Sequence, residues 1–177
     1  TLVDPATCVD CTETGTLTVD QVHIGLFFNT ACSLPVEISF VEAENEGGCF
    51  LPEDDVTLMT PLGLDLVGTA PGVYQYDITL PNPVCLRGPA FLMVRVTGIN
   101  PQCVAAESRP ELTYGDENNC PLCHYFFLTD GGGSGDLCDP TDTPQRVPLQ
   151  QWVSGACCSL MPVAKKSWGE LKVRYRN

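Results

Sequence analysis

Basic residues and histidine are scarce in this chain. Only nine of its 177 residues are Lys or Arg, against 22 Asp or Glu, which gives a formal net charge of −13, and it has two histidines. Nucleic acid and anionic membrane surfaces are bound by basic patches. We therefore expect neither as a partner.

The chain also lacks long apolar runs. No run approaches the roughly 18 residues of a membrane-spanning helix, and no charged-then-apolar leader opens the sequence. The first residue is Thr1 rather than Met. We expect an exported chain whose signal peptide has been removed, or a trimmed piece of a longer one, with no membrane span.

Cysteine, in contrast, is abundant, with 11 residues. Disulfides in an oxidising compartment are the usual reason for so many, so we predict an extracellular or cell-surface protein. The odd count leaves at least one thiol free, paired between chains or bound to something. The disulfide candidates are Cys8, Cys11, Cys32, Cys49, Cys85, Cys103, Cys120, Cys123, Cys138, Cys157 and Cys158.

The pairing of these cysteines is not fixed by their spacing. Near neighbours in sequence are the first choice, for example Cys32 with Cys49 and Cys85 with Cys103. The adjacent Cys157 and Cys158 are expected to bond two different partners, because a ring between neighbours is strained.

Short alternating segments dominate the middle of the chain. Alternation predicts strands near 17–26, 36–40, 73–80, 90–99, 124–129 and 149–155, with a one-residue slip near Asp20. Residues 47–49 and 51–55 are predicted as turns, the apolar stretch 56–68 is broken by Pro61 and Gly63, and the Pro81–Pro83 segment is predicted to end a strand. Eight or nine strands and no helix predict an all-β, disulfide-stapled two-sheet β-sandwich, jelly-roll or immunoglobulin-like. The expected parts are an N-terminal arm (1–15) tied down by its cysteines, the sandwich (16–160) and a basic tail (161–177).

The C-terminal tail reverses the charge of the rest of the chain. Residues 165–177 hold five of the nine basic residues and one of the 22 acidic ones, so they carry about four positive charges, while the other 164 residues, with four basic and 21 acidic groups, carry about 17 negative ones. Apolar and cationic residues alternate here, which is typical of a strand. We predict that this strand docks on an acidic body, either its own or a neighbour's, through Trp168, Leu171, Lys172, Val173, Arg174, Tyr175 and Arg176.

Two cysteine motifs could hold a cofactor. Cys120-Pro-Leu-Cys123-His124 has the CxxCH pattern of c-type haem attachment, in which His124 would be one axial ligand and His23 could be the other. Cys8 and Cys11 form a second CxxC pair, so a four-cysteine zinc site with Cys120 and Cys123 is also formally possible. Disulfides are the simpler use of the same residues.

Further candidates are acidic and aromatic. Asp130, Asp136, Asp139 and Asp142 lie in a Gly-rich loop that could supply oxygen ligands to Ca²⁺, although a solvated loop is the simpler interpretation. GGGSG fails to complete a G-x-S-x-G motif because Asp136 occupies its last position, and neither histidine has a Ser or Cys partner in a recognisable motif, so we predict no enzyme. The aromatic residues that could stack on sugars are Tyr74, Tyr76, Tyr114, Tyr125 and Trp152.

Several segments carry a resemblance. PNPVCLRGPAFLMVRVTG, NNCPLCHYF and QQWVSGACC resemble a cysteine-containing β-sandwich domain of secreted proteins from uncultivated bacterial lineages, and PVAKKSWGELKVRYRN resembles the SWG-x-(L/I/V)-K-x-x-YR tail of many secreted proteins of those lineages. The resemblance implies export and a β-sandwich, with no activity that can be transferred.

Taken together, these observations favour a non-enzymatic extracellular structural protein. Its copies would form a filament or surface appendage by strand exchange through a terminal segment. The alternatives are a secreted carbohydrate- or Ca²⁺-binding module and a single-haem cytochrome.

Overall fold

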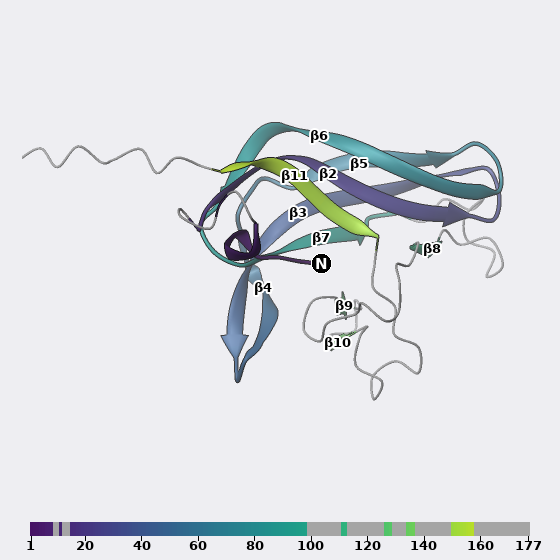
Figure 1. The fold of residues 1–177 in the computed structure, drawn as a ribbon. Coiled ribbons are helices and arrows are strands. Elements are labelled where there is room, and N and C mark those ends of the chain that lie inside the picture. The colour runs from purple at the N-terminus through teal and green to yellow at the C-terminus, as the bar shows by residue number, and fades with distance from the viewer. Residues whose placement is uncertain are drawn as a thin grey trace, which may run out of the picture.

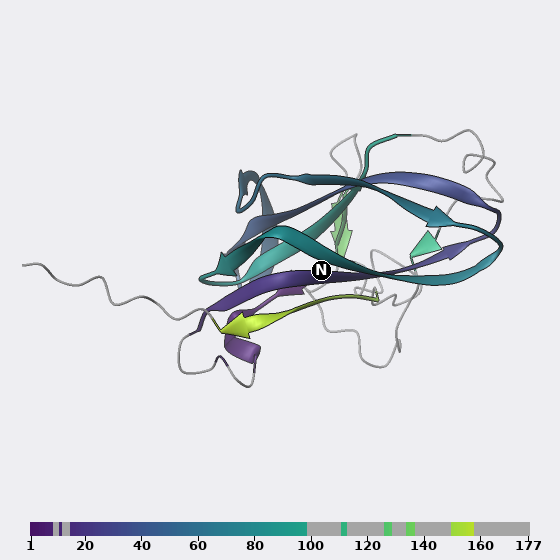
Figure 2. The same ribbon diagram turned by 90° about the horizontal axis from the view of Figure 1, so that it is seen from above.

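The computed structural model describes residues 1–8, 11, 15–98, 111–112, 126–128, 134–136 and 150–157. These residues form an all-β sandwich of two antiparallel sheets, as the alternation predicts; the sheets overlap in the view of Figure 1 and lie one above the other in Figure 2. No α-helix occurs in these ranges, and none of their helices is long and apolar enough to cross a membrane.

The larger sheet is centred on β3. It contains β1 (Leu2–Val3), β7 (Ala90–Val96), β3 (Cys32–Glu46), β4 (Cys49–Thr57) and β5 (Leu62–Gly68). β3 pairs with β7 along one edge and with both β5 and β4 along the other, and β1 extends β7. Figure 1 shows the end of β3 and β4 projecting from the sandwich as a hairpin.

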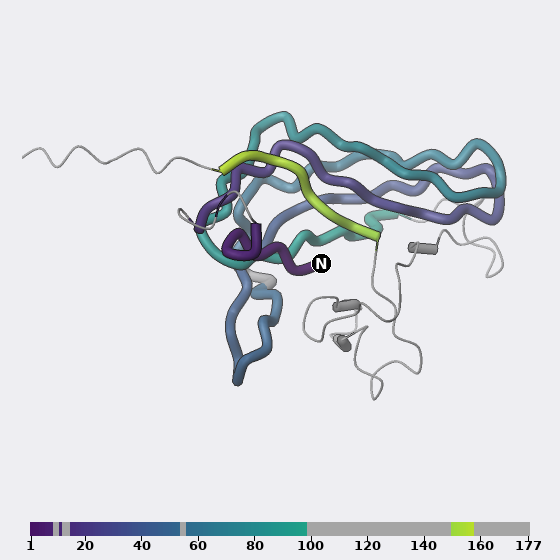
Figure 3. Tube along the Cα trace, in the orientation of Figure 1, coloured from purple at the N-terminus to yellow at the C-terminus, as the bar shows by residue number. Residues whose placement is uncertain are grey.

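The smaller sheet has β2 at its centre. It contains β11 (Gln151–Cys157), β2 (Leu17–Phe28) and β6 (Gly72–Leu86), in that order, and β8 (Glu111–Leu112) also pairs with β2. Figure 3 shows β11 running along β2 near the N-terminal segment. Two further strands, β9 (Phe126–Leu128) and β10 (Ser134–Asp136), pair with each other.

The core lies between the two sheets. Alternate residues of a strand point to opposite faces, so β2 buries Val22, Ile24 and Phe28, while β3 buries Ile38 and Phe40 from the other side. All five side chains are inaccessible to solvent and belong to one apolar cluster. This interleaving of two apolar faces is what holds the sandwich together.

The predicted slip in β2 is confirmed. Pairing with β11 passes from Gln21–Ser154 to Val19–Gly155, so Asp20 is the extra residue of a bulge on that side. Pairing with β6 also shifts here, from Gln21–Thr79 to Val19–Val84, so on that side the four β6 residues 80–83 lie opposite Asp20. Only glycine fits at 155, because a Cβ there would run into the carbonyl oxygen of Thr18.

Two turn predictions are wrong. Residues 51–55 lie within β4 instead of forming a turn, since β4 pairs with the exposed end of β3. The turn predicted at 47–49 does form at Gly47 and Gly48, and Cys49 begins β4. β6 does not end at Pro81 but runs through Pro83 to Leu86. Neither proline faces a β2 residue in the register, because both lie where the Asp20 bulge interrupts pairing, and proline is tolerated at such bulges.

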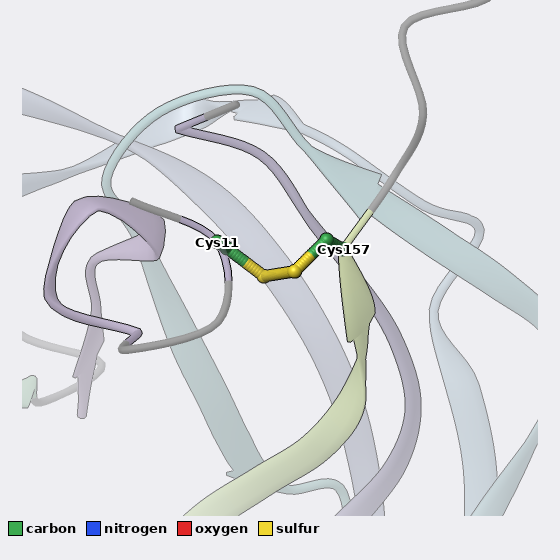
Figure 4. Close-up of a disulfide and its surroundings, with 2 residues drawn as sticks. All are labelled: Cys11 and Cys157. Atoms are coloured by element: carbon green, nitrogen blue, oxygen red, sulfur yellow. A yellow bond between two sulfur atoms is a disulfide. The ribbon is translucent and has the colours of Figure 1, made fainter. Parts of the chain in front are cut away.

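One disulfide ties the N-terminal arm to the sandwich. Cys11, which follows the 3-10 helix η1 (Pro5–Thr7), is bonded to Cys157 at the end of β11, 146 residues away in sequence (Figure 4). Cys32, Cys49 and Cys85 are also disulfide-bonded. Cys8 is the exception among the described candidates: its thiol is unpaired and packs, half-buried, against the core.

The expected pairing of Cys32 with Cys49 is wrong. Cys49 lies opposite Glu46 at one end of β3, while Cys32 begins the strand at the other end. Fourteen residues of extended strand separate the two positions by roughly 45 Å, far more than a disulfide spans. Cys103, Cys120, Cys123, Cys138 and Cys158 lie outside the described residues.

Candidate functional site on the outer face of the smaller sheet

A polar cluster lies on the face of the smaller sheet that points away from the core. Val22 and Ile24 point inward, so His23 between them points outward. The register sets Asp77 of β6 opposite His23 on one side and Trp152 of β11 opposite it on the other. Ser154 lies two residues further along β11 and therefore shares the face with Trp152.

Both ring nitrogens of His23 are hydrogen-bonded. Nδ1 lies 2.6 Å from Oδ1 of Asp77, and Nε2 lies 2.8 Å from Oγ of Ser154. An ionised carboxylate can only accept, so Nδ1 carries the proton and donates it to Asp77. In the neutral ring Nε2 is then the acceptor, and the Ser154 hydroxyl donates to it.

Trp152 covers one face of the imidazole. The two rings are stacked, with centroids 5.0 Å apart and planes 11° apart. As a result His23 is buried although it lies on an outer face, while Trp152 itself is 43% exposed. Aromatic contact on one side and hydrogen bonds at both nitrogens hold the ring in one orientation.

A groove runs beside this cluster, along β11. It has a volume of about 470 Å³ and lies between β11 and the N-terminal segment. Its walls include Trp152, Ser154 and Gly155 from β11 and Leu2 and Asp4 from the N-terminal segment. Ser154 therefore joins the hydrogen-bonded cluster to an open groove.

The order Ser154–His23–Asp77 is that of a nucleophile, a base and a carboxylate that orients the base. In such a triad the imidazole accepts the serine proton at one nitrogen while the carboxylate holds the other. We call the hydrogen-bonded set Asp77, His23 and Ser154 the relay. No α/β-hydrolase-type motif surrounds Ser154, so the sequence did not predict this relay. Its members are 54 and 131 residues apart along the chain, and only strand pairing unites them.

Two of the predicted cofactor ligands, His23 and Cys11, already have other bonding partners in the structure. His23 has no unoccupied ring nitrogen, which argues against its use as a haem ligand. Cys11 is in a disulfide, so it cannot serve as a zinc thiolate. Within the described residues no group of three or more His, Cys, Asp or Glu could hold a metal ion. The CxxCH motif at Cys120–His124 and the side chains of the Asp130–Asp142 loop lie outside the described residues.

The predicted sugar-stacking aromatic residues do not all lie on the surface. Tyr74 and Tyr76 point inward and pack edge-on against Phe28, so they form no surface platform. The Tyr74 hydroxyl is hydrogen-bonded to Thr69 and Ala70, and the Thr69 side chain chiefly lowers its pKa. Trp152 alone of the described candidates is exposed, and Tyr114 and Tyr125 lie outside the described residues.

The docking residues predicted in the tail, 168–177, also lie outside the described residues. Comparison of the chain with family models, with curated proteins and with solved structures found no match.

Proposed function

We propose that this chain is an extracellular structural subunit whose copies assemble into a filament or surface appendage by strand addition. The observation that carries the proposal is the outer edge of β11. Among the described residues β11 pairs only with β2, so within this part of the chain its other edge has no strand partner, and the groove runs along it. An open edge beside a groove is what strand addition needs, because backbone groups supply affinity and the groove receives side chains.

The backbone of β11 offers hydrogen bonds at this edge. The carbonyl of Gln150 accepts from the Gly25 amide of β2, at 2.9 Å. In an antiparallel pair the residues that bond the partner alternate with residues that face away. Gln151 and Val153 therefore present their backbone groups to the open side.

Prolines interrupt part of the other edge of the same sheet. Pro81 and Pro83 interrupt the outer part of β6, and proline removes the backbone donor that a new strand would use. β4 likewise carries Pro52. β11 has no proline, which favours it as the acceptor edge.

The occupant we propose is the C-terminal segment 168–177 of a neighbouring copy. Its Leu171, Val173 and Tyr175 alternate with cations, and the acceptor is acidic: Asp4 lines the groove, and Asp20 is exposed at the bulge beside it. Arg87 and Arg95 are the two basic residues within the described ranges. A contact between a tail and a different surface of the next copy does not close on itself, so it propagates as a filament.

Removing the donor tests the proposal. A chain without residues 168–177 should remain folded and monomeric in light scattering and electron microscopy, whereas the full chain should form filaments. A synthetic 165–177 peptide in excess should slow assembly of the full chain, and a scrambled peptide should not. Filaments formed at an undiminished rate by the shortened chain would disprove tail donation.

A change in the acceptor edge gives a second, independent test. Val153→Pro removes an amide that faces the open edge and leaves the amides that bond β2 in place. The matched control is Val153→Ala, which also loses side-chain contacts but keeps the amide. We expect assembly to fail in the proline variant and to continue in the alanine variant, with circular dichroism showing both to be folded.

A second candidate is a carbohydrate-binding module, favoured by Trp152. One face of its indole stacks on His23 and the residue remains 43% exposed, so a sugar ring could stack on the side away from His23. Calorimetric titration with soluble polysaccharides would reveal this binding. It should be lost in Trp152→Ala and unaffected by deletion of the tail.

A further inference from the structure

Beyond assembly, we infer that Ser154 is an activated nucleophile that accepts acyl groups from carboxylic esters, with His23 as its base and Asp77 as the residue that orients His23. The inference rests on the side chain of Ser154, but it uses the groove that the proposed assembly would fill, so it applies to copies that are not assembled. Assembly depends on the backbone of β11, whereas this reactivity depends on the hydroxyl of one residue.

Three features support this role. The Ser154 hydroxyl donates to Nε2 of His23 at 2.8 Å, the distance expected between a nucleophile and its general base. Asp77 fixes the ring through Nδ1, at 2.6 Å, and selects the tautomer whose Nε2 can accept a proton. Trp152 shields one face of the imidazole, which keeps the ring aligned with Ser154.

The surroundings of Ser154 leave room for a substrate. The residue lies on the wall of the 470 Å³ groove, beside the exposed Trp152. An ester with a ring in its alcohol part could stack on Trp152 while its carbonyl approaches Ser154. The substrate class is thus a carboxylic ester, with an aromatic or sugar-like leaving group favoured.

The reaction proceeds in two balanced steps. Ser154 Oγ bonds to the carbonyl carbon as its proton passes to His23 Nε2; the ester C–O bond then breaks, and the alcohol leaves with that proton. Water next attacks the acyl-serine in the same way, giving up one proton through His23. The carboxylic acid departs, and the serine hydroxyl is restored.

A fluorophosphonate probe tests the nucleophile directly on the full chain. Attack forms a Ser154 O–P bond and releases fluoride, and the proton leaves through His23. Intact-mass and peptide mass spectrometry should show one adduct, located on Ser154. Ser154→Ala should abolish the adduct, and Ser39→Ala, a substitution on the other sheet, should leave its rate unchanged.

The relay predicts further readouts that a structural hydrogen bond would not give. A general base contributes about 10²- to 10⁴-fold, so His23→Gln should slow labelling by at least about a hundredfold and Asp77→Asn by at least about tenfold. p-Nitrophenyl acetate should release nitrophenol in the same rank order of variants.

The inference is overturned if the unaltered chain shows no adduct, if the adduct is on another residue, or if His23→Gln is labelled at the unaltered rate while folded by circular dichroism. Asp77 is largely exposed, so Asp77→Asn keeps the test decisive even if His23→Gln does not fold. Labelling is measured on the unassembled full chain, where the groove is not filled by a neighbouring tail, so failure to form filaments would not bear on these results.

Discussion

The two faces of β2 differ in the kind of side chain they carry and in what those side chains do. Its inner face carries Val22, Ile24 and Phe28 into the core, while its outer face carries His23 into a cluster with Asp77 and Ser154. The inner face is apolar and requires only that side chains fill space. The outer face is polar and requires particular atoms at particular distances.

The difference separates stability from chemistry. Burial of apolar surface dominates folding energy, so changes on the inner face should act on unfolding. A contact made by a largely exposed carboxylate, such as that of Asp77 with His23, contributes about 0–1 kcal/mol, so changes to Asp77 on the outer face should act on reactivity and leave the fold nearly intact.

The largest effect is expected for Phe28→Ala. Phe28 is fully buried and in contact with Tyr74 and Tyr76, and loss of such a ring costs about 3–5 kcal/mol. The matched control is Phe27→Ala, one residue earlier on the outer face and only partly buried. Urea unfolding should show a clearly smaller loss for Phe27, and equal losses would contradict the division of faces.

The inner face was also the part that sequence could predict. Alternation located β2 and its slip at Asp20, because every second residue had to be apolar. β4 was missed because its partner, the end of β3, is exposed and leaves little apolar signal. The relay was missed because His23, Asp77 and Ser154 meet only after β11 and β6 have paired with β2, and no local pattern encodes that meeting.

The next largest effect concerns the attachment of β11, which brings Ser154 to His23. Replacing Cys11 and Cys157 by Ser should lower the free energy of unfolding by about 2–4 kcal/mol, since the bond ties residues 146 apart. Cys8→Ser is the control, because Cys8 forms no disulfide. Denaturant unfolding without reductant measures both, and a Cys8 effect as large as that of the disulfide would contradict this assignment.

A smaller effect is expected for Asp77→Asn. The carboxylate is 63% exposed at its side chain, and the amide oxygen of Asn can still accept from Nδ1 of His23. We expect a change in the free energy of unfolding of no more than about 1 kcal/mol, measured by urea titration. A much larger loss would mean that the outer cluster supports the fold, and it would weaken the case for a separate chemical role.

The smallest effect on the free energy of unfolding is expected for Tyr76→Phe, which removes a polar atom from the inner face of the smaller sheet. The hydroxyl of Tyr76 is buried and has no hydrogen-bond partner within the described part of the chain. Burial, and next the neighbouring Tyr74, raise the pKa of Tyr76 above its ordinary value of 10.0. Tyr76→Phe removes this unsatisfied group, so stability at neutral pH should change by no more than about 1 kcal/mol, and any change should be a gain.

The pH dependence of Tyr76 has a definite sign. The folded chain holds the phenolic proton more tightly than the unfolded chain, so stability falls as pH rises above 10 and through the raised pKa. Absorbance near 295 nm, where tyrosinate absorbs, should show one tyrosine that ionises late, and Tyr76→Phe should remove it together with that part of the alkaline loss. An unchanged late titration in the variant would show that another tyrosine is the buried one, and the inner face of the sheet would then lack the polar exception assigned to it.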